Sequence, residues 1–325
     1  MTDRIDWEEP GPTDCPPSVA EDLRAAALAA VAGGLAARPF YRREDLGIRD
    51  KGINDPVTEA DHAANDAILR VLHAHLPDDA VRSEESPPAA DHTTAGRLWI
   101  VDPLDGTKEF IRQNGEFAVM VGLATGGAAS LGAVLRPEPG RLYLGIVGTG
   151  AWIADVTWDG GAGDAAASDA ARVSVGRFRP LRLPALRPAR LRIVRSRSHP
   201  DPLITAVADG LGASSITSGS VGLKCAILAE GEAEIYVHPV PFLSEWDTCA
   251  PEAVLRGAGG LVSDCRGEPL RYGKQDLKQP YGIFAARADV WNDALPLVQA
   301  VTSDKLGFDS APSAGQTPNR TLRTN

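Results

Sequence analysis

Apolar residues recur with a helical period in two segments near the start of the chain. The first is an alanine- and leucine-rich stretch that opens at Ser18, the first residue of a capping-box pattern, and is weakened near its end by Gly33-Gly34. The second opens at Thr58, whose spacing to Asp61 is again that of a capping box. We therefore predict one helix from Ser18 and another from about Thr58.

Short apolar runs separated by Gly, Pro and Thr clusters come next, which is the pattern of β-strands. They cover residues 98–101, 117–123, 133–135, 142–147 and 151–156. A low-complexity stretch at 159–171 follows, which we interpret as a surface loop or linker. Beyond it the pattern alternates between strands and helices, with strands at 191–194 and 234–237 and helices at 202–211, 221–230 and 248–257.

This change of pattern predicts two domains in an α/β protein, an α+β layered sandwich of alternating α and β layers. We expect a loose, proline-rich arm at 1–17, an α+β domain that binds metal at 18–185 and an α/β domain at 186–302. Residues 303–325 are rich in polar residues and proline, so we expect a disordered tail there.

Composition and charge narrow the possible functions. The 325 residues are 43% hydrophobic, enough for a sizeable core, and carry a formal net charge of −10. Proteins that bind nucleic acid through its phosphate backbone are usually basic, so the charge argues against nucleic acid as a partner. An acidic chain that takes a phosphorylated substrate needs cations between the two.

The chain has no pattern typical of a membrane or secreted protein. Its longest apolar stretch, residues 25–37, is shorter than the roughly 20 residues that span a bilayer, and the acidic N-terminus has no signal-peptide pattern. The four cysteines have no C-x-x-C spacing and are interpreted as free thiols. We expect a cytoplasmic protein with no stable membrane span, either a monomer or a homodimer.

Candidate chemistry is concentrated in residues 99–110, WIVDPLDGTKEF. There an apolar strand ends in Asp102, and Asp105 follows across a proline turn. Two carboxylates at the end of one strand can converge on a hard cation such as Mg²⁺, and the amides that open the next helix suit an anion. The alternative is an ordinary Asp-Pro-x-Asp-Gly turn.

Two other acidic segments bear on this choice. Glu84 and Glu85 follow a short apolar run, and they either belong to a site or form a solvated surface. Asp247 comes just before a predicted helix, where it is either a ligand or only the N-cap. Each segment alone leaves both interpretations open, and their combination with Asp102 and Asp105 favours a metal site.

Four blocks occur in the order typical of one family: DPVTEAD at 55–61, SEES at 83–86, DPLDGTKEF at 102–110, and Trp246-Asp247 ahead of a helix that ends in Gly-Ala-Gly-Gly. Over about residues 18 to 300 the chain resembles the inositol monophosphatase superfamily, lithium-sensitive and Mg²⁺-dependent phosphomonoesterases. The resemblance implies the layered fold of that superfamily and two or three Mg²⁺ ions, which can activate water and neutralise phosphoryl charge.

The resemblance also implies a role for each matching residue. Thr107 would hydrogen-bond the attacking water, and the amides of Gly106 and Thr107 would hold the phosphate. Glu85 would act as a base-like group, and Asp55 would belong to the catalytic set near a weaker metal site. The metal ligands would be the carboxylates of Glu84, Asp102, Asp105 and Asp247 and the carbonyl of Leu104.

Details favour the 3'(2'),5'-bisphosphate nucleotidase (CysQ) branch of the superfamily. The chain has Lys108-Glu109 where inositol monophosphatases usually have x-Asn, and it lacks their sugar-binding Glu upstream of Trp246-Asp247. It departs from the branch motif K-x-D-x-x-P-V-T, because Ile53 stands at the Asp position and the acid is at Asp55. This departure leaves the water-activating base open.

The implied function is Mg²⁺-dependent removal of the 3'-phosphate of adenosine 3',5'-bisphosphate, and of its sulfated analogue. Arg195, Arg197 and Lys224 are the candidates to hold the second phosphate. The full set of expected substrate contacts is Gly106, Thr107, Lys108, Arg195, Arg197, Ser220, Lys224 and Glu245. The alternatives are an inositol monophosphatase or broad sugar phosphatase, and a catalytically weak protein that binds a phosphorylated effector.

Overall fold

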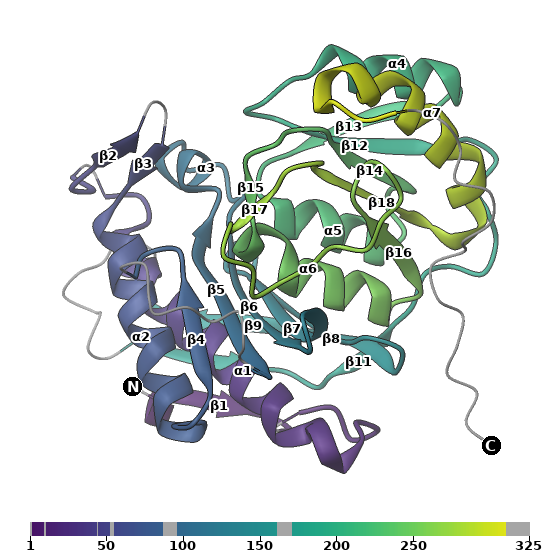
Figure 1. Ribbon diagram of the computed structural model, residues 1–325. Helices are drawn as coiled ribbons and strands as arrows, with labels where there is room; N and C mark the ends of the chain where they lie inside the picture. The colour runs from purple at the N-terminus through teal and green to yellow at the C-terminus, as the bar shows by residue number, and fades with distance from the viewer. Residues whose placement is uncertain are drawn as a thin grey trace.

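Two large β-sheets and layers of helices alternate through the part of the molecule that the structure describes (Figure 1). The computed structural model describes residues 2–9, 11–43, 45–52, 55–86, 96–160 and 171–309. Helices α1 (Pro17–Ala37) and α2 (Glu59–His75) cover one face of the larger sheet. Helices α5 (Val221–Ala229) and α6 (Glu245–Gly257) lie between the sheets, and α4 (Pro202–Gly210) and α7 (Ala288–Leu306) cover the smaller sheet from outside. The layered α/β fold expected from the sequence is confirmed.

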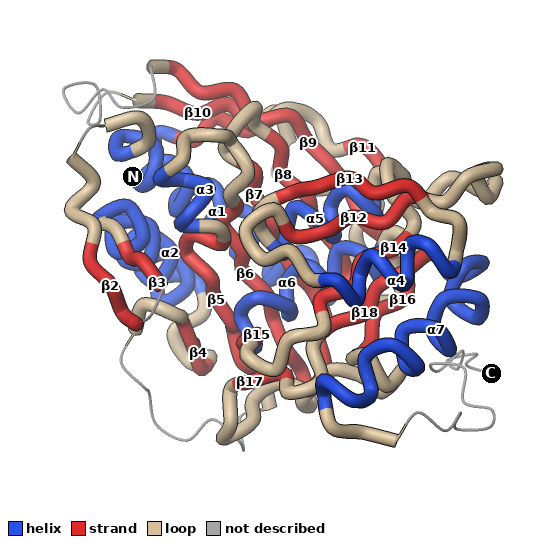
Figure 2. Tube along the Cα trace, turned by 90° about the horizontal axis from the view of Figure 1, so that it is seen from above, coloured by secondary structure: helices blue, strands red, loops and turns tan. Residues whose placement is uncertain are grey.

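Over the described residues the larger sheet has nine strands, eight of them in the order β1-β10-β9-β8-β7-β6-β5-β4 and the ninth, β11, paired to β9. Figure 2 shows the order from β10 to β4 from above. The strands are β1 (Ile5–Trp7), β4 (Ala80–Ser83), β5 (Arg97–Asp105), β6 (Ala118–Thr125), β7 (Ala128–Arg136), β8 (Arg141–Ile146), β9 (Gly150–Asp159), β10 (Arg172–Val175) and β11 (Arg179–Leu181). Strands β4 and β5 run parallel, with Ser83 beside Val101. The residues that follow β4 therefore lie next to the carboxyl-terminal half of β5.

In the described part of the chain, the smaller sheet has five strands in the order β13-β12-β14-β18-β16. They are β12 (Arg192–Ser196), β13 (Ser214–Ser218), β14 (Ile235–His238), β16 (Gly260–Ser263) and β18 (Ile283–Arg287). Short pairs join β2 (Arg49–Gly52) to β3 (Asp55–Val57) and β15 (Leu243–Ser244) to β17 (Lys278–Gln279). The remaining short elements are η1 (Thr2–Arg4), η2 (Arg38–Phe40) and α3 (Thr107–Ile111).

Helix α1 differs from its prediction at both ends. It begins at Pro17, after Pro16 in the N-cap position, so Ser18 is not the cap. It also continues through Gly33 and Gly34, although each glycine costs a helix about 1 kcal/mol relative to alanine. A Cβ at Gly34 would lie 2.4 Å from Leu135 Cδ2, so the glycines let the helix pack closely against the sheet. The second predicted start is confirmed, because Thr58 and Asp61 form a capping box.

Two described segments near the chain ends are structured where the sequence predicted a loose arm and a disordered tail. Residues 5–7, within the predicted loose arm, form β1 and pair in parallel with β10. Helix α7 continues past the predicted boundary at 302 to Leu306, because Thr302 and Ser303 are buried in its packed face. Phe308 then packs against Tyr281, with ring centroids 6.0 Å apart.

Residues 310–325 of the expected tail, and 161–170 of the expected linker, lie outside the described residues. The division into two domains at 185/186 stays a prediction. Within the described ranges, no helix has the length and apolar character needed to cross a membrane. All four cysteines are free thiols, as the sequence predicted.

Candidate metal centre and active site

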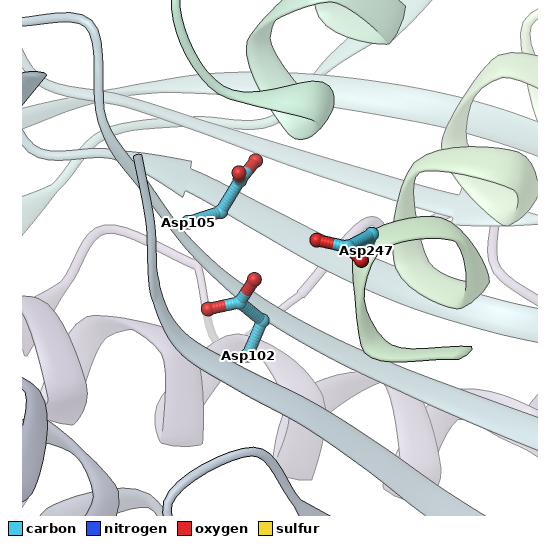
Figure 3. A group of neighbouring side chains, drawn as sticks. All are labelled: Asp102, Asp105 and Asp247. Atoms are coloured by element: carbon cyan, nitrogen blue, oxygen red, sulfur yellow. The ribbon is translucent and has the colours of Figure 1, made fainter. Parts of the chain in front are cut away.

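Three carboxylates from two elements meet between the sheets. Asp102 and Asp105 come from the end of β5, and Asp247 comes from the first turn of α6 (Figure 3). One oxygen of each lies within 4.8 Å of the others. In a regular strand, residues three apart point to opposite faces. Here Asp102 pairs with Met120 and Asp105 with Ala118, so β5 has one extra residue, and this bulge turns both carboxylates to one side.

Asp247 is placed by the capping of α6. The helix begins at Glu245, three residues before its predicted start, and Ser244 is its N-cap. Asp247 is the third helical residue, so the N-cap interpretation is wrong, and one of its oxygens accepts a hydrogen bond from Ser244 N at 2.5 Å. The capping box thus holds the carboxylate at the helix start, where it faces β5 (Figure 3).

A row of glycines in the larger sheet brings α6 close to β5. Gly122, Gly132 and Gly145 lie side by side on β6, β7 and β8. A Cβ at Gly132 would lie 2.7 Å from Ala250 Cα, and one at Gly145 would lie 2.4 Å from Val254 Cα. Since these distances exclude a side chain, the backbone of α6 rests directly on the sheet, and its first turn approaches the β5 carboxylates.

The electrostatics of the cluster favour a bound cation. Burial and the charges of Glu84 and Asp105 raise the pKa of Asp102 well above its usual value. Burial and the charge of Asp105 raise the pKa of Asp247 to about 7. The three ligand atoms are oxygens, the donors that hard cations such as Mg²⁺ prefer. The residues therefore fit Mg²⁺, whose charge would relieve their mutual repulsion.

Asp105 is supported by the start of α5. Its Oδ2 accepts hydrogen bonds from Ser220 Oγ at 2.5 Å and Gly222 N at 2.8 Å. Ser220 has a positive φ of 41°, and its hydroxyl also accepts from Leu223 N at 3.1 Å. These contacts give Ser220, a predicted substrate contact, a role in holding Asp105. Burial still raises the pKa of Asp105, and the charge of nearby Lys224 opposes that rise.

Thr107 forms a hydrogen-bonded pair with a residue that the sequence assigned only to capping. Its hydroxyl lies 3.0 Å from Asp61 Oδ1 and 3.2 Å from the Leu104 carbonyl oxygen. The other oxygen of Asp61 accepts from Thr58 N at 2.8 Å. Burial raises the pKa of Asp61, and the charge of Glu85 adds to the rise. Asp61 is the last residue of the DPVTEAD block, and that block was the sequence signal that could have indicated this second role.

The remaining acidic candidates lie around this group. Glu84 follows β4, and its amide donates to the Val101 carbonyl at 3.1 Å. Glu84 is not one of the three residues whose oxygens meet within 4.8 Å, although its charge acts on Asp102. The Glu85 side chain is only 3% exposed, so it is not a solvated surface. Asp55 begins β3, and its side chain lies outside the described part of the chain.

Each expected anchor for a second phosphate has a partner within the protein, and Arg195 lies apart from the other two. Arg195 Nη1 contacts Thr205 Oγ1 of α4 at 3.1 Å, on the outer side of the smaller sheet. Arg197 forms two hydrogen bonds of 2.6 Å with the carboxylate of Glu116. Lys224 is buried and donates to the Gly219 carbonyl at 2.8 Å, and burial lowers its pKa to about 8. The structure therefore does not bring Arg195 together with Lys224.

Lys108 lies at the edge of the site, beside a histidine that was not among the predicted contacts. Its Nζ is 3.5 Å from His199 Nε2, on the loop that follows β12. Gly106 precedes Thr107 with a φ of 94°, and a Cβ there would lie 3.0 Å from the Glu116 carbonyl oxygen. The turn that presents the Gly106 and Thr107 amides therefore depends on glycine.

The carboxylate of Glu245, a predicted substrate contact, is bound within the protein. Its side chain is 0% exposed and is paired with Arg82 of β4. Its oxygens also accept from the backbone amides of Gly273 at 3.1 Å and Lys274 at 2.9 Å. These three donors occupy the carboxylate, which argues against a contact with substrate.

Comparison with known proteins identifies the family. Residues 19–301 match the Inositol monophosphatase family. The chain is 35% identical over 246 residues to the 3'(2'),5'-bisphosphate nucleotidase CysQ of Escherichia coli strain K12, covering 75% of this chain and 91% of that protein. It is 31% identical over 289 residues to the 3'-phosphoadenosine 5'-phosphate phosphatase of Mycobacterium leprae strain TN, covering 85% and 93%.

A solved structure agrees with these sequence matches. The crystal structure of CysQ from Bacteroides thetaiotaomicron superposes with a TM-score of 0.66 at 34% identity, covering 82% of this chain and 97% of that one. The likeness therefore extends over most of both chains. The chain belongs to the inositol monophosphatase family.

Proposed function

We propose that this phosphatase of the inositol monophosphatase family removes the 3'-phosphate of adenosine 3',5'-bisphosphate with the help of Mg²⁺. The observation that carries the proposal is the cluster of buried Asp102 and Asp105 with half-buried Asp247, whose oxygens lie within 4.8 Å of one another. The substrate assignment is supported by relatives at 31–35% identity that are named as nucleotidases or phosphatases of this substrate class.

In this proposal the cluster holds the metal, with further ligands from Glu84 and the Leu104 carbonyl. Bound Mg²⁺ supplies positive charge that neutralises phosphoryl oxygens and lowers the pKa of water. Two or three ions would also balance the repulsion that raises the pKa values of Asp102 and Asp247. An acidic protein could then accept a polyanion.

Thr107 and Asp61 are the proposed pair for the attacking water. When Thr107 donates its hydroxyl hydrogen to Asp61, 3.0 Å away, the threonine oxygen is free to accept a hydrogen from water. The raised pKa of Asp61 makes its carboxylate a better proton acceptor. This pair offers a base that does not depend on Asp55. Glu85 acts on it by raising the pKa of Asp61.

We choose the proposed substrate contacts by comparing the partners that each candidate residue already has within the protein. The amides of Gly106 and Thr107 would hold the reacting phosphate at the start of α3. Lys108, beside His199 at the edge of the site, is better placed for a second phosphate than Arg197, which is paired with Glu116. Binding energy from such a remote phosphate can position the reacting group and so raise turnover.

A substrate panel in Mg²⁺ tests the proposal. It compares kcat/KM for adenosine 3',5'-bisphosphate, adenosine 3'-monophosphate, inositol 1-phosphate and fructose 1,6-bisphosphate. We expect the nucleotide bisphosphate to exceed inositol 1-phosphate by at least about tenfold, the scale of one lost recognition contact. Equal efficiencies would refute the nucleotidase assignment, and no turnover of any substrate would favour the effector-binding alternative.

A further inference from the structure

A buried ion pair joins the two elements that flank the acidic cluster. Arg82 lies in β4, two residues before Glu84, and Glu245 is the first residue of α6, two residues before Asp247. Arg82 Nη1 donates to Glu245 Oε2 at 2.5 Å. The two side chains are 11% and 0% exposed, so the contact is shielded from water.

The same carboxylate also holds a third segment. Gly273 N donates to Glu245 Oε2 and Lys274 N donates to Oε1, while the amide of Glu245 itself donates to the Leu277 carbonyl at 2.9 Å. The first residue of α6 is therefore tied both to β4 and to the loop that leads into β17. On the other side, Ser83 Oγ donates to Asn65 Oδ1 of α2 at 2.6 Å, which fixes the end of β4.

These ties determine where Asp247 points. One of its oxygens is engaged by Ser244 N in the capping box, so the direction of the other depends on the position of the first turn of α6. The glycine row sets how far α6 lies from the sheet, but it does not stop the helix from sliding along the sheet. The Arg82–Glu245 pair is a directional contact that opposes such sliding.

We propose that Arg82 and Glu245 are positioning residues for the metal site, and that their ion pair sets the spacing between Glu84 after β4 and Asp247 in α6. This inference rests on the metal-dependent function proposed above. A buried ion pair usually adds little net stability compared with apolar side chains of the same size. Its structural value here is a defined distance between two acidic ligands that repel each other.

The test measures Mg²⁺ binding without substrate, from the rise in Tm as MgCl₂ is added. We expect Glu245→Gln to raise the Mg²⁺ concentration for half of this rise by about tenfold, as for residues that orient metal ligands elsewhere. The matched control is Glu234→Gln. Glu234 is also buried and pairs with Arg192, but it directly precedes β14 of the smaller sheet and does not belong to the acidic cluster. We expect that variant to bind Mg²⁺ like the wild type.

A second variant separates positioning from stability. Arg82→Met combined with Glu245→Gln leaves no uncompensated buried charge, so we expect it to recover most of the lost Tm but not the Mg²⁺ affinity. The double variant also serves to test the inference if Glu245→Gln alone does not fold. Arg82→Lys alone keeps a positive charge beside Glu245, so we expect this variant to keep part of the wild-type Mg²⁺ affinity.

Two results would overturn the inference. One is a Glu245→Gln variant whose Mg²⁺ affinity equals that of Glu234→Gln, and the other is wild-type affinity in the double variant. Failure of the proposed function is a different result, since the wild type itself would then show neither a Mg²⁺-dependent Tm nor phosphatase activity.

Discussion

The carboxylate of Asp105 has two roles. Oδ2 accepts from Ser220 and Gly222, and the carboxylate also contributes to the group formed with Asp102 and Asp247. In Asp105→Asn the amide oxygen can keep the first role, while the NH₂ group cannot bind a cation. We expect turnover to fall by at least about a hundredfold, the effect of losing one preorganised electrostatic group.

The stability of Asp105→Asn should not fall, because the substitution removes one of several repelling buried charges. The measurements are kcat in saturating Mg²⁺ and Tm in EDTA. Turnover close to the wild-type value would exclude Asp105 as a ligand. A large loss of Tm together with turnover would instead indicate that the contacts with α5 are the main role of Asp105.

Thr107 permits a sharper comparison, since serine keeps its hydroxyl and valine keeps its shape. We expect Thr107→Val to lose about a hundredfold or more in kcat, the lower end of what general acid–base catalysis contributes. Thr107→Ser should stay within about tenfold of the wild type, because its hydroxyl can still donate to Asp61. The two kcat values are compared at the same Mg²⁺ concentration, and similar activities would contradict the Thr107–Asp61 pair.

At the scale of elements, the position of α6 depends on glycines that belong to other strands. Gly132 faces Ala250 of α6, where a Cβ would lie 2.7 Å from the Cα and 2.8 Å from the carbonyl oxygen. We expect Gly132→Ala to lower the free energy of unfolding by about 1–3 kcal/mol, the usual effect of overpacking. Denaturant unfolding measures this loss.

The same substitution should weaken Mg²⁺ binding, because α6 carries Asp247. Gly96→Ala is the control, since Gly96 is exposed and a Cβ there meets nothing within 4 Å. It should change neither stability nor Mg²⁺ affinity. If Gly132→Ala were as stable as this control, the close approach of α6 would not require the glycine row.

At the scale of the whole molecule, the acidic cluster makes stability depend on metal and pH. The pKa of Asp247 is raised from 3.8 to about 7. Between these values the metal-free folded chain holds more protons than the unfolded chain, so this group's contribution to stability falls as pH rises through that window. Mg²⁺ takes the place of those protons.

We therefore expect Mg²⁺ to raise Tm more at about pH 8 than at about pH 5.5, because protonated carboxyl groups do not bind the cation. Thermal unfolding in EDTA and in excess Mg²⁺ at both pH values measures this difference. In Asp247→Asn the difference should shrink. An equal rise at both pH values in the wild type would contradict the link between this cluster and metal binding.

The sequence alone determined the features that depend on neighbouring residues. Apolar runs bounded by turn residues predicted the strands from β5 to β9, and the Thr58–Asp61 spacing predicted the start of α2, because both patterns are local. The acidic blocks, in their order along the chain, were sufficient to indicate the family. The type of site and the layered fold could therefore be expected before the structure was known.

Only the tertiary structure decided how those parts meet. The bulge between Asp102 and Asp105, and the close packing of α6 on three glycines, bring Asp247 to β5 from a distant part of the chain. Arg197 and Glu245 looked available for substrate in the sequence, but their partners, Glu116 and Arg82, are remote along the chain. A charged residue's role depends on which opposite charge folding places beside it, and local pattern does not contain that information.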